Sequence, residues 1–264
     1  MMDHCIFNLE NKNAVITGGC GWLGLQMAKI LSQYGANVII TTRDLPKGLE
    51  TIKQLDQSNP NQHHYAIELN VNDNQQQIEK KFNELVEIYD GKIDILVNNA
   101  MEFTTKDISN ISLDEFNHHQ SHNGFYFYLS KLVRDLAVTN NLPSSIVNIG
   151  SMYGLVSSYP EVYIQQNNAS SIAYHALKGG LINMTKHMAV YWAKDNIRVN
   201  CLSPGAFPKP SIDNDFKHKL EEKIPMGKVG IPTQLQGPLL LLVSDAGSYM
   251  TGHNLVVDGG WTIQ

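Results

Sequence analysis

Cysteine is scarce in this chain, with three residues among 264. Cys5, Cys20 and Cys201 lack the spacing of a metal-binding motif and are too few for a disulfide framework, so reduced thiols are expected. Long apolar runs are also missing, because the longest aliphatic stretch, residues 239–243, is far shorter than the roughly 20 residues that cross a bilayer. These absences exclude a disulfide-stabilised scaffold and a membrane-embedded protein.

An excess of basic residues is absent as well. The chain has 20 Lys and Arg against 25 Asp and Glu, a formal net charge of −5, which argues against nucleic acid as the main partner. The first five residues contain an early acid and lack the basic and apolar regions of a secretory signal. We therefore expect a cytoplasmic protein that acts on a small molecule.

What the sequence does contain is a regular alternation of two patterns. Short β-branched runs predict strands at 14–17, 37–41, 65–69, 93–97, 145–149, 197–200 and 255–257. Between them, amphipathic stretches predict helices at 23–34, 75–89, 114–136, 172–194 and 233–243. This alternation predicts an α/β fold with a parallel sheet covered by helices on both faces. Neither a linker nor an internal repeat divides the chain, so residues 1–264 are expected to form a single domain.

A glycine-rich turn follows the first predicted strand. Gly18, Gly19, Gly21 and Gly24 fall within seven residues, between a strand and a helical pattern. Glycines let the backbone turn sharply and approach a pyrophosphate, whose charge the start of the following helix favours. Dinucleotide binding is therefore favoured over a simple tight turn.

The end of the second predicted strand carries information about the cofactor. An acid at this place accepts from a ribose 2′-hydroxyl, whereas an arginine pairs with a 2′-phosphate. Thr42 is followed by Arg43 and Asp44. Arg43 favours NADP(H), while Asp44 leaves NAD(H) open.

A tyrosine and a lysine occupy one face of the helical pattern that begins at residue 172. Tyr174 and Lys178 are four residues apart, which brings a phenol close to an ammonium group. Positive charge favours the phenolate form, so Tyr174 is a candidate proton relay. Ser151 follows the fifth predicted strand, where its hydroxyl can donate to a carbonyl oxygen.

Taken together, these motifs resemble the short-chain dehydrogenase/reductase family in its compact single-domain form. The resemblance covers nearly the whole chain and rests on residues 17–24, 98–100, Ser151, 174–178, 200–205 and 249–260. It implies a Rossmann-like, doubly wound parallel sheet of seven strands. It also implies that Tyr174 is the general acid/base, that Ser151 polarises the carbonyl, and that Lys178 binds the nicotinamide ribose and lowers the pKa of the tyrosine.

The resemblance also implies which residues bind the dinucleotide. They are Thr17, Gly18, Cys20, Trp22, Leu23, Gly24, Thr42, Arg43, Asn70, Val71, Asn99, Ala100, Tyr174, Lys178, Pro204, Gly205 and Phe207. A proton-relay asparagine is matched by Asn123, although counting from the following aromatic run selects Ser121 instead. The chain departs from the family pattern at two positions. The second glycine of the turn usually falls at the position of Trp22 but here is Gly21, and the glycine that usually follows residues 98–100 is replaced by Met101.

Two variable segments are expected to lie over the substrate, near residues 152–173 and 207–226. The first is about ten residues longer than is usual for the family, and its hydroxyls and amides favour a sugar or polyol-type substrate. A solvated loop or a subunit contact is the alternative for this segment, and a solvated helix face is the alternative for the second.

Five histidines, His63, His64, His118, His119 and His122, raise the question of a metal site. His118 and His122 have helical i, i+4 spacing but no carboxylate companion in the sequence pattern. Surface or packing roles are preferred, and no metal is assigned.

The function that these features favour is hydride transfer between NADP(H), or NAD(H), and a secondary alcohol/ketone pair. A 3-oxoacyl thioester reductase, a non-catalytic dinucleotide sensor or scaffold, and a nucleotide-sugar epimerase or dehydratase stay as alternatives. The last has little room in this chain for an additional substrate domain. Members of the compact branch assemble through their long helices, so a homodimer or homotetramer is expected.

Overall fold

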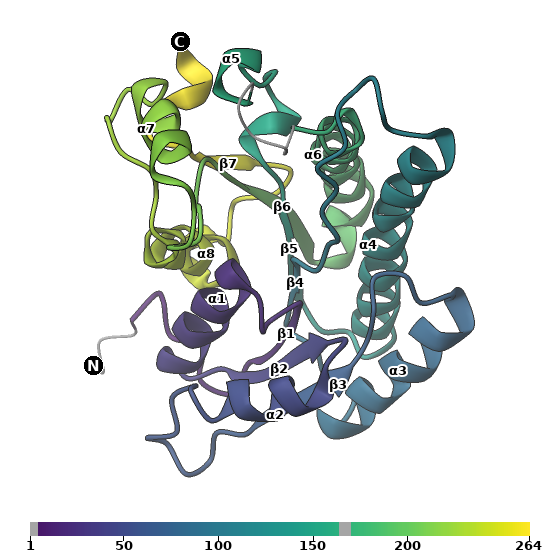
Figure 1. Ribbon diagram of the computed structural model, residues 1–264. Helices are drawn as coiled ribbons and strands as arrows, with labels where there is room; N and C mark the ends of the chain where they lie inside the picture. Colours follow the sequence, from purple (N-terminus) through teal and green to yellow (C-terminus); the bar gives the residue numbers. More distant parts are fainter. Residues whose placement is uncertain (1–4, 164–169) are drawn as a thin grey trace.

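A single parallel sheet forms the centre of the molecule in the computed structural model, which describes residues 5–163 and 170–264. Over these residues, seven strands are hydrogen-bonded in the order β3-β2-β1-β4-β5-β6-β7 (Figure 1). The strands are β1 (Asn13–Thr17), β2 (Asn37–Thr42), β3 (His64–Glu68), β4 (Ile95–Asn98), β5 (Ser144–Ile149), β6 (Ile197–Pro204) and β7 (Asn254–Val257). The predicted doubly wound α/β fold is confirmed.

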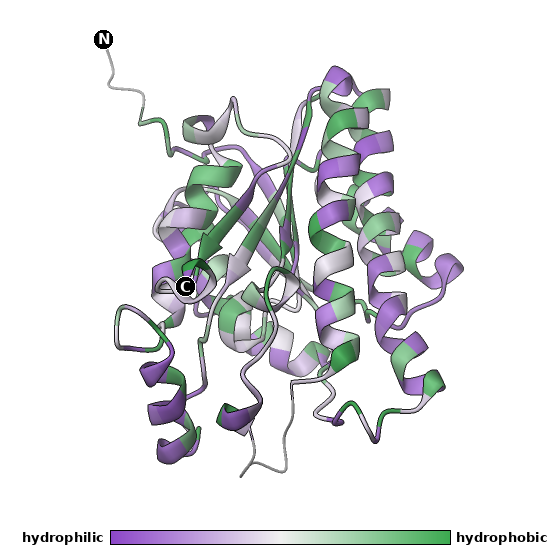
Figure 2. Cartoon of the chain, turned by 90° about the horizontal axis from the view of Figure 1, so that it is seen from above, coloured by the Kyte–Doolittle hydropathy of each residue, from purple (hydrophilic) through white to green (hydrophobic). Residues whose placement is uncertain are grey.

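Helices cover both faces of the sheet. In the described part of the chain they are α1 (Trp22–Gln33), α2 (Leu45–Ile52), α3 (Gln75–Ile88), α4 (Leu113–Thr139), α5 (Pro160–Tyr163), α6 (Ile172–Trp192), α7 (Asn214–Glu222) and α8 (Gln236–Val243). Figure 1 shows α1 and α8 on one side of the sheet and α3, α4 and α6 on the other. Each side has its own buried apolar cluster. Figure 2 shows bands of hydrophobic and hydrophilic residues alternating along the helices that flank the sheet.

Helix α2 was not predicted from the sequence. Pro46 and Gly48 are typical of turns, but a proline in the first turn of a helix loses no helical hydrogen bond. The helix begins because the side chain of Asp44 accepts the N–H of Lys47. Gly48 is needed because a Cβ there would lie 2.9 Å from side-chain atoms of Ala66 and Thr42. Gly48 therefore serves close packing of α2 on β2 and β3, although glycine at such a position in a sequence usually indicates a loop.

The strand order places the functional end of the sheet. β1 pairs with β2 on one side and with β4 on the other, so the chain reverses its direction of winding beside β1. Ligands of such sheets bind at the carboxyl ends of the strands next to this switch. The turns after β1 and β4 meet here, because the Thr17 hydroxyl accepts the N–H groups of Asn99 and Ala100 at 2.8 and 2.9 Å.

Over residues 5–163 and 170–264, no helix is both long enough and apolar enough to cross a bilayer.

Candidate active site

A cleft of about 700 Å³ opens at the carboxyl ends of the strands, beside the switch point. It runs from the glycine turn after β1, past the ends of β2 and β4, to the end of β5 and the start of α6. Its walls contain every residue predicted to bind the dinucleotide except Thr17: Gly18, Cys20, Trp22, Leu23, Gly24, Thr42, Arg43, Asn70, Val71, Asn99, Ala100, Tyr174, Lys178, Pro204, Gly205 and Phe207. Thr17 is buried and instead holds the turn after β4 in place.

The glycine turn is shaped to receive an anion. Gly18 has a φ of +66°, and a Cβ on Gly24 would lie only 2.4 Å from the carbonyl oxygen of Gly18. Helix α1 begins directly after Gly21, at which no side chain of the described residues caps the helix. Unpaired N–H groups and the positive end of a helix favour a phosphate. The residues of this turn therefore fit the pyrophosphate of a dinucleotide.

The end of β2 carries the two candidate charges. The carboxylate of Asp44 is engaged as the cap of α2, at 3.0 Å from the N–H of Lys47. The Arg43 side chain is 72% exposed and pairs with Glu102, with 3.1 Å between Nη1 and Oε1. The cap of α2 engages only Oδ1 of Asp44, and both Asp44 and Arg43 line the cleft. The Arg43 guanidinium suits a phosphate, and the Asp44 carboxylate suits a ribose hydroxyl.

The three candidate catalytic residues meet at the other end of the same cleft. Ser151 follows β5, and its Oγ accepts the N–H of Tyr153 at 3.1 Å. Tyr174 and Lys178 lie one turn apart on α6, with Nζ 5.7 Å from the centre of the tyrosine ring. Lys178 is 2% exposed, and its Nζ donates to the carbonyl of Ile149 at 2.6 Å. A phenol, a hydroxyl and a buried cation therefore surround one position where a substrate oxygen can bind.

Comparisons with known proteins agree with this geometry. A family model described as enoyl-(acyl carrier protein) reductase matches residues 22–262. A D-arabinitol 2-dehydrogenase (ribulose-forming) of Scheffersomyces stipitis is 32% identical over 274 residues, covering 97% of this chain and 95% of that protein. A short chain dehydrogenase of Leptospira borgpetersenii with bound NAD+ superimposes with a TM-score of 0.86 at 28% identity, over 99% of this chain and 97% of that one. The chain belongs to the short-chain dehydrogenase/reductase family.

Other members of the family that resemble this enzyme differ in their named substrates. A 3-oxoacyl-acyl-carrier-protein reductase of Chlamydia trachomatis is 30% identical, over 96% of this chain and 98% of that protein. A gluconate 5-dehydrogenase of Burkholderia cenocepacia, in complex with NADP and tartrate, has a TM-score of 0.85 at 26% identity, with 98% of each chain covered. Membership of the family confirms the prediction of an oxidoreductase.

Burial affects the pKa values of the candidate catalytic pair, Tyr174 and Lys178. It raises the pKa of Tyr174 to about 12, although a hydrogen bond with Ser151 acts in the opposite direction. It lowers the pKa of Lys178 to about 8. Burial is the largest cause of the Tyr174 shift, so the phenol is protonated at neutral pH in the chain by itself. That Lys178 lowers the pKa of Tyr174 stays a prediction.

The two proton-relay candidates occupy different surroundings. Asn123 lies on α4 and donates through Nδ2 to the carbonyl of Leu177, at 3.0 Å, next to Lys178. Ser121 is exposed and donates to the carbonyl of His118 in its own helix. Neither lines the cleft. Asn123 is the one that contacts the catalytic helix.

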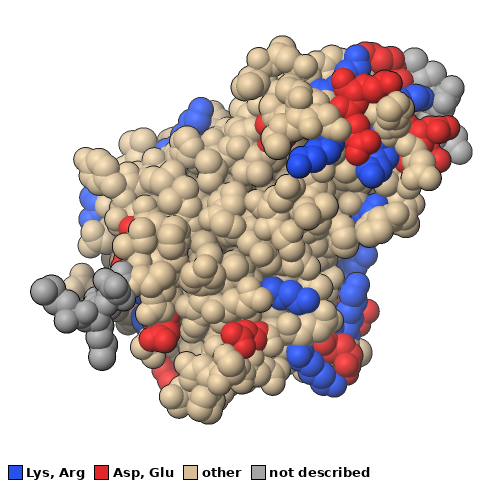
Figure 3. Space-filling view, turned by 90° about the vertical axis from the view of Figure 1, so that its left-hand side faces the viewer, with Lys and Arg blue, Asp and Glu red and all other residues tan. Residues whose placement is uncertain are grey.

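The two variable segments pack against each other in their described parts. Tyr153 and Val162 of the first share a buried cluster with Leu220 and Ile224 of the second, together with Trp261. The helix α7 carries charges of both signs, and Figure 3 shows such side chains gathered at the end of the molecule where Figure 1 places α7. Of the amides in the first segment, residues 165–168 lie outside the described residues.

Several residues of the cleft were not predicted. They are Lys47, Leu69, Glu102, Phe103, Ile149, Gly150 and Lys209, while Gly21, Asp44 and Met101 were considered from the sequence without being assigned to the site. The most informative are Glu102, which pairs with Arg43, and Phe103, whose ring stacks on Tyr174 with 6.0 Å between centres. Both lie two to three residues after the predicted turn 98–100. Their place just beyond the end of a strand could have indicated that they line the cleft.

Proposed function

We propose that this enzyme interconverts a secondary alcohol and a ketone of the polyol or sugar-acid class, with a nicotinamide dinucleotide as its cofactor. The observation that carries this proposal is the placement of Ser151, Tyr174 and Lys178 in the same cleft as the glycine turn after β1. When bound, the dinucleotide supplies or accepts the hydride. The residues of this chain manage the position and the proton of the substrate oxygen.

Each of the three residues has a distinct part in this chemistry. The Ser151 hydroxyl, oriented by the N–H of Tyr153, donates to the substrate oxygen and holds it beside the phenol. Tyr174 gives that oxygen a proton in reduction and removes it in oxidation. Lys178 keeps its ammonium within 5.7 Å of the ring centre, where it stabilises phenolate once the dinucleotide excludes water.

The cofactor of choice is NADP(H). Three basic residues, Arg43, Lys47 and Lys209, line the cleft. An arginine fork pairs with a 2′-phosphate, and one oxygen of the Asp44 carboxylate is already engaged by the cap of α2. The gluconate 5-dehydrogenase with NADP in its crystals agrees with this choice.

Polar side chains on the segment after Ser151 support the substrate class. A second hollow, of about 1330 Å³, has a mixed lining that includes Tyr153, Tyr163, Ser170 and His175 as well as apolar side chains such as Leu155 and Ile172. The hydroxyls of Tyr153 and Tyr163 are 2.7 Å apart, and Ser170 Oγ is 2.7 Å from His175 Nε2. Such paired donors and acceptors suit hydroxyl groups better than an acyl chain.

A comparison of substrates tests the proposal. Purified enzyme is assayed with pentitols, sugar acids and polyhydroxy ketones, and separately with 3-oxoacyl thioesters, each with NADP(H) and NAD(H). The absorbance of the reduced nicotinamide reports turnover. We expect a higher kcat/KM for the polyhydroxy compounds, and a marked preference for thioesters would overturn the substrate class while leaving the redox chemistry in place.

Exposed apolar side chains on α4 and α6 bear on the oligomeric state, and the cysteines bear on the cellular location. Helix α4 packs on α6, and Phe127, Val190 and Tyr191 of these helices expose large parts of their side chains. We infer a homodimer or homotetramer formed through these helices, which light scattering on purified protein would test. Cys5, Cys20 and Cys201 are free thiols, consistent with a reducing compartment such as the cytoplasm.

A further inference from the structure

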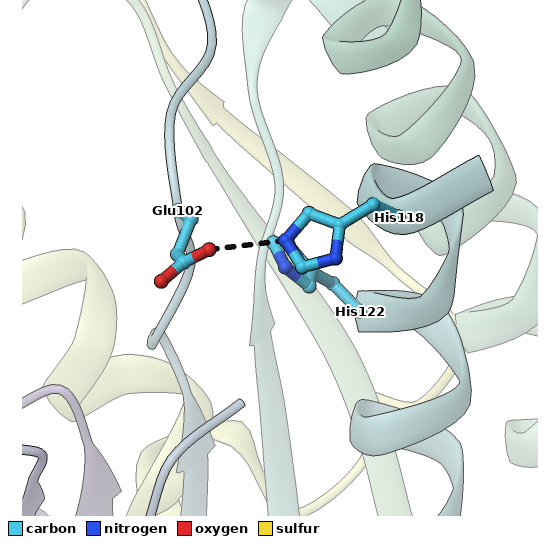
Figure 4. A group of neighbouring side chains, drawn as sticks. All are labelled: Glu102, His118 and His122. Carbon is cyan, nitrogen blue, oxygen red and sulfur yellow. Dashed lines mark hydrogen bonds and ion pairs between the residues drawn. The ribbon is translucent and has the colours of Figure 1, made fainter. Parts of the chain in front are cut away.

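Three side chains that have no part in the proposed redox chemistry converge at the wall of the cofactor cleft that contains Glu102. They are Glu102, on the loop after β4, and His118 and His122, one turn apart on α4 (Figure 4). One ligand atom from each lies within 4.8 Å of the others. The sequence pattern lacks a carboxylate companion for the two histidines because that companion comes from a different element, and the fold supplies it.

Of the three side chains, only those of Glu102 and His118 have hydrogen-bond or ion-pair partners within the described part of the chain. Glu102 accepts from Arg43 through Oε1 at 3.1 Å, and its Oε2 lies 3.1 Å from His118 Nε2. His122 is fully buried, at 0% exposure, yet neither ring nitrogen has a hydrogen-bond partner among residues 5–163 and 170–264. A buried polar group without a partner is costly, so a native fold normally supplies one. The orphaned imidazole next to a histidine and a carboxylate therefore points to a ligand that all three share.

We propose that Glu102, His118 and His122 bind a divalent transition-metal ion of the zinc type. Two imidazoles and one carboxylate are a ligand set that Zn²⁺ takes with a water as its fourth ligand. Around a tetrahedral ion with bonds of about 2.1 Å, ligand atoms lie about 3.4 Å apart. Side-chain rotations that move the ligand atoms by about 1 Å would bring these three atoms to that spacing. The exposed His118 can make such a rotation, because its side chain is 48% exposed.

The position of this metal site gives it a consequence for the cleft. Glu102 is followed by Phe103, whose ring stacks on Tyr174. A metal held by Glu102 and by α4 fixes the loop after β4 to that helix. The ion therefore orders the wall that carries Phe103, without contact to the reacting atoms.

Titration of the purified, untagged protein tests the site. After treatment with a chelator, Zn²⁺ is added under isothermal calorimetry, and Co²⁺ is added as a spectroscopic probe of tetrahedral coordination. We expect one Zn²⁺ per chain. Loss of a group that only hydrogen-bonds to a metal ligand typically costs about 10–100-fold in metal affinity. Glu102→Gln and His118→Gln each remove a ligand itself, so each should weaken Zn²⁺ binding by about 100-fold or more.

A matched control comes from another helix. His218 and Glu222 form an exposed i, i+4 pair on α7, with 3.4 Å between Nε2 and Oε1. Among residues 5–163 and 170–264, no third ligand joins them in a cluster of the kind that Glu102, His118 and His122 form. His218→Gln should leave Zn²⁺ affinity unchanged. Affinity no tighter than about 1 mM in the parent chain, or affinity within threefold of the parent in both Glu102→Gln and His118→Gln, overturns the proposal. Circular dichroism verifies that the exposed-site variant His118→Gln is folded.

Discussion

Replacing Lys178 with methionine should make this enzyme inactive and change how its stability responds to pH. Lys178 is 2% exposed, and burial lowers its pKa from the ordinary 10.5 to about 8. The unfolded chain therefore binds more protons than the folded chain between these two values. Because of this, the folded protein is penalised at neutral pH, and the penalty is relieved as the pH rises through 8 toward 10.5.

The magnitude follows from the two pKa values. The difference between 10.5 and about 8, at about 1.4 kcal/mol for each pH unit, corresponds to about 3 kcal/mol of unfavourable free energy at neutral pH. Methionine removes this penalty, but it also leaves the Ile149 carbonyl without its donor, which costs about 1–3 kcal/mol. The variant should therefore be as stable as the parent, or more stable by up to about 2 kcal/mol, at about pH 7.

The pH-dependent part of the difference is the sharper readout, because the carbonyl cost does not change with pH. Urea unfolding of both proteins is measured at about pH 7 and about pH 9.5. Stability of the parent relative to Lys178→Met should increase by about 2 kcal/mol over this interval. A difference that stays constant, or one that falls, would show that Lys178 is not a desolvated cation and would refute the electrostatic reasoning for the site.

Three further predictions concern the cleft. Tyr174→Phe should lower turnover by about 10²–10⁴-fold with little change in dinucleotide affinity measured by fluorescence, whereas retained activity would remove Tyr174 from its role as acid/base. Arg43→Ala should weaken NADPH binding by about 10–100-fold, because a charge-assisted contact is lost, and should leave NADH binding unchanged; an equal effect on both would contradict the assignment of a 2′-phosphate site. Thr17→Val should lower the free energy of unfolding by about 1–3 kcal/mol for each N–H of Asn99 and Ala100 that loses its acceptor, and urea midpoints identical to those of the parent would disprove this positioning role.

The sequence predicted the sheet well because its central strands, such as β1, β4 and β5, are buried on both faces and form short apolar runs. Tyr174, Lys178 and Ser151 were also accessible, since a helical spacing and a strand end determine where they lie. The order β3-β2-β1-β4-β5-β6-β7 confirms the architecture that the resemblance implied. Local pattern and the alternation of elements were thus sufficient for the α/β architecture and for placing these three side chains in one cleft.

Properties that depend on contacts between distant elements could not be predicted. The hydroxyl of Thr17 holds the turn after β4 rather than the dinucleotide, which follows only from the pairing of β1 with β4. Glu102 reaches His118 and His122 across 16 and 20 positions of the chain, a spacing that resembles no motif. The pKa of Tyr174 was expected to be low, but burial depends on packing that the sequence does not display.

The most direct test of the central claim follows the hydride itself. Ribulose is offered to the enzyme with NADPH that carries deuterium at the transferring position of the nicotinamide, and the pentitol product is analysed by mass spectrometry. We predict a product with one deuterium at the former carbonyl carbon, formed by the parent chain and at least 100-fold more slowly by Tyr174→Phe, as about 10²–10⁴-fold is expected from loss of an acid/base group. Product without deuterium, or deuterated product formed equally fast by Tyr174→Phe, would contradict the account.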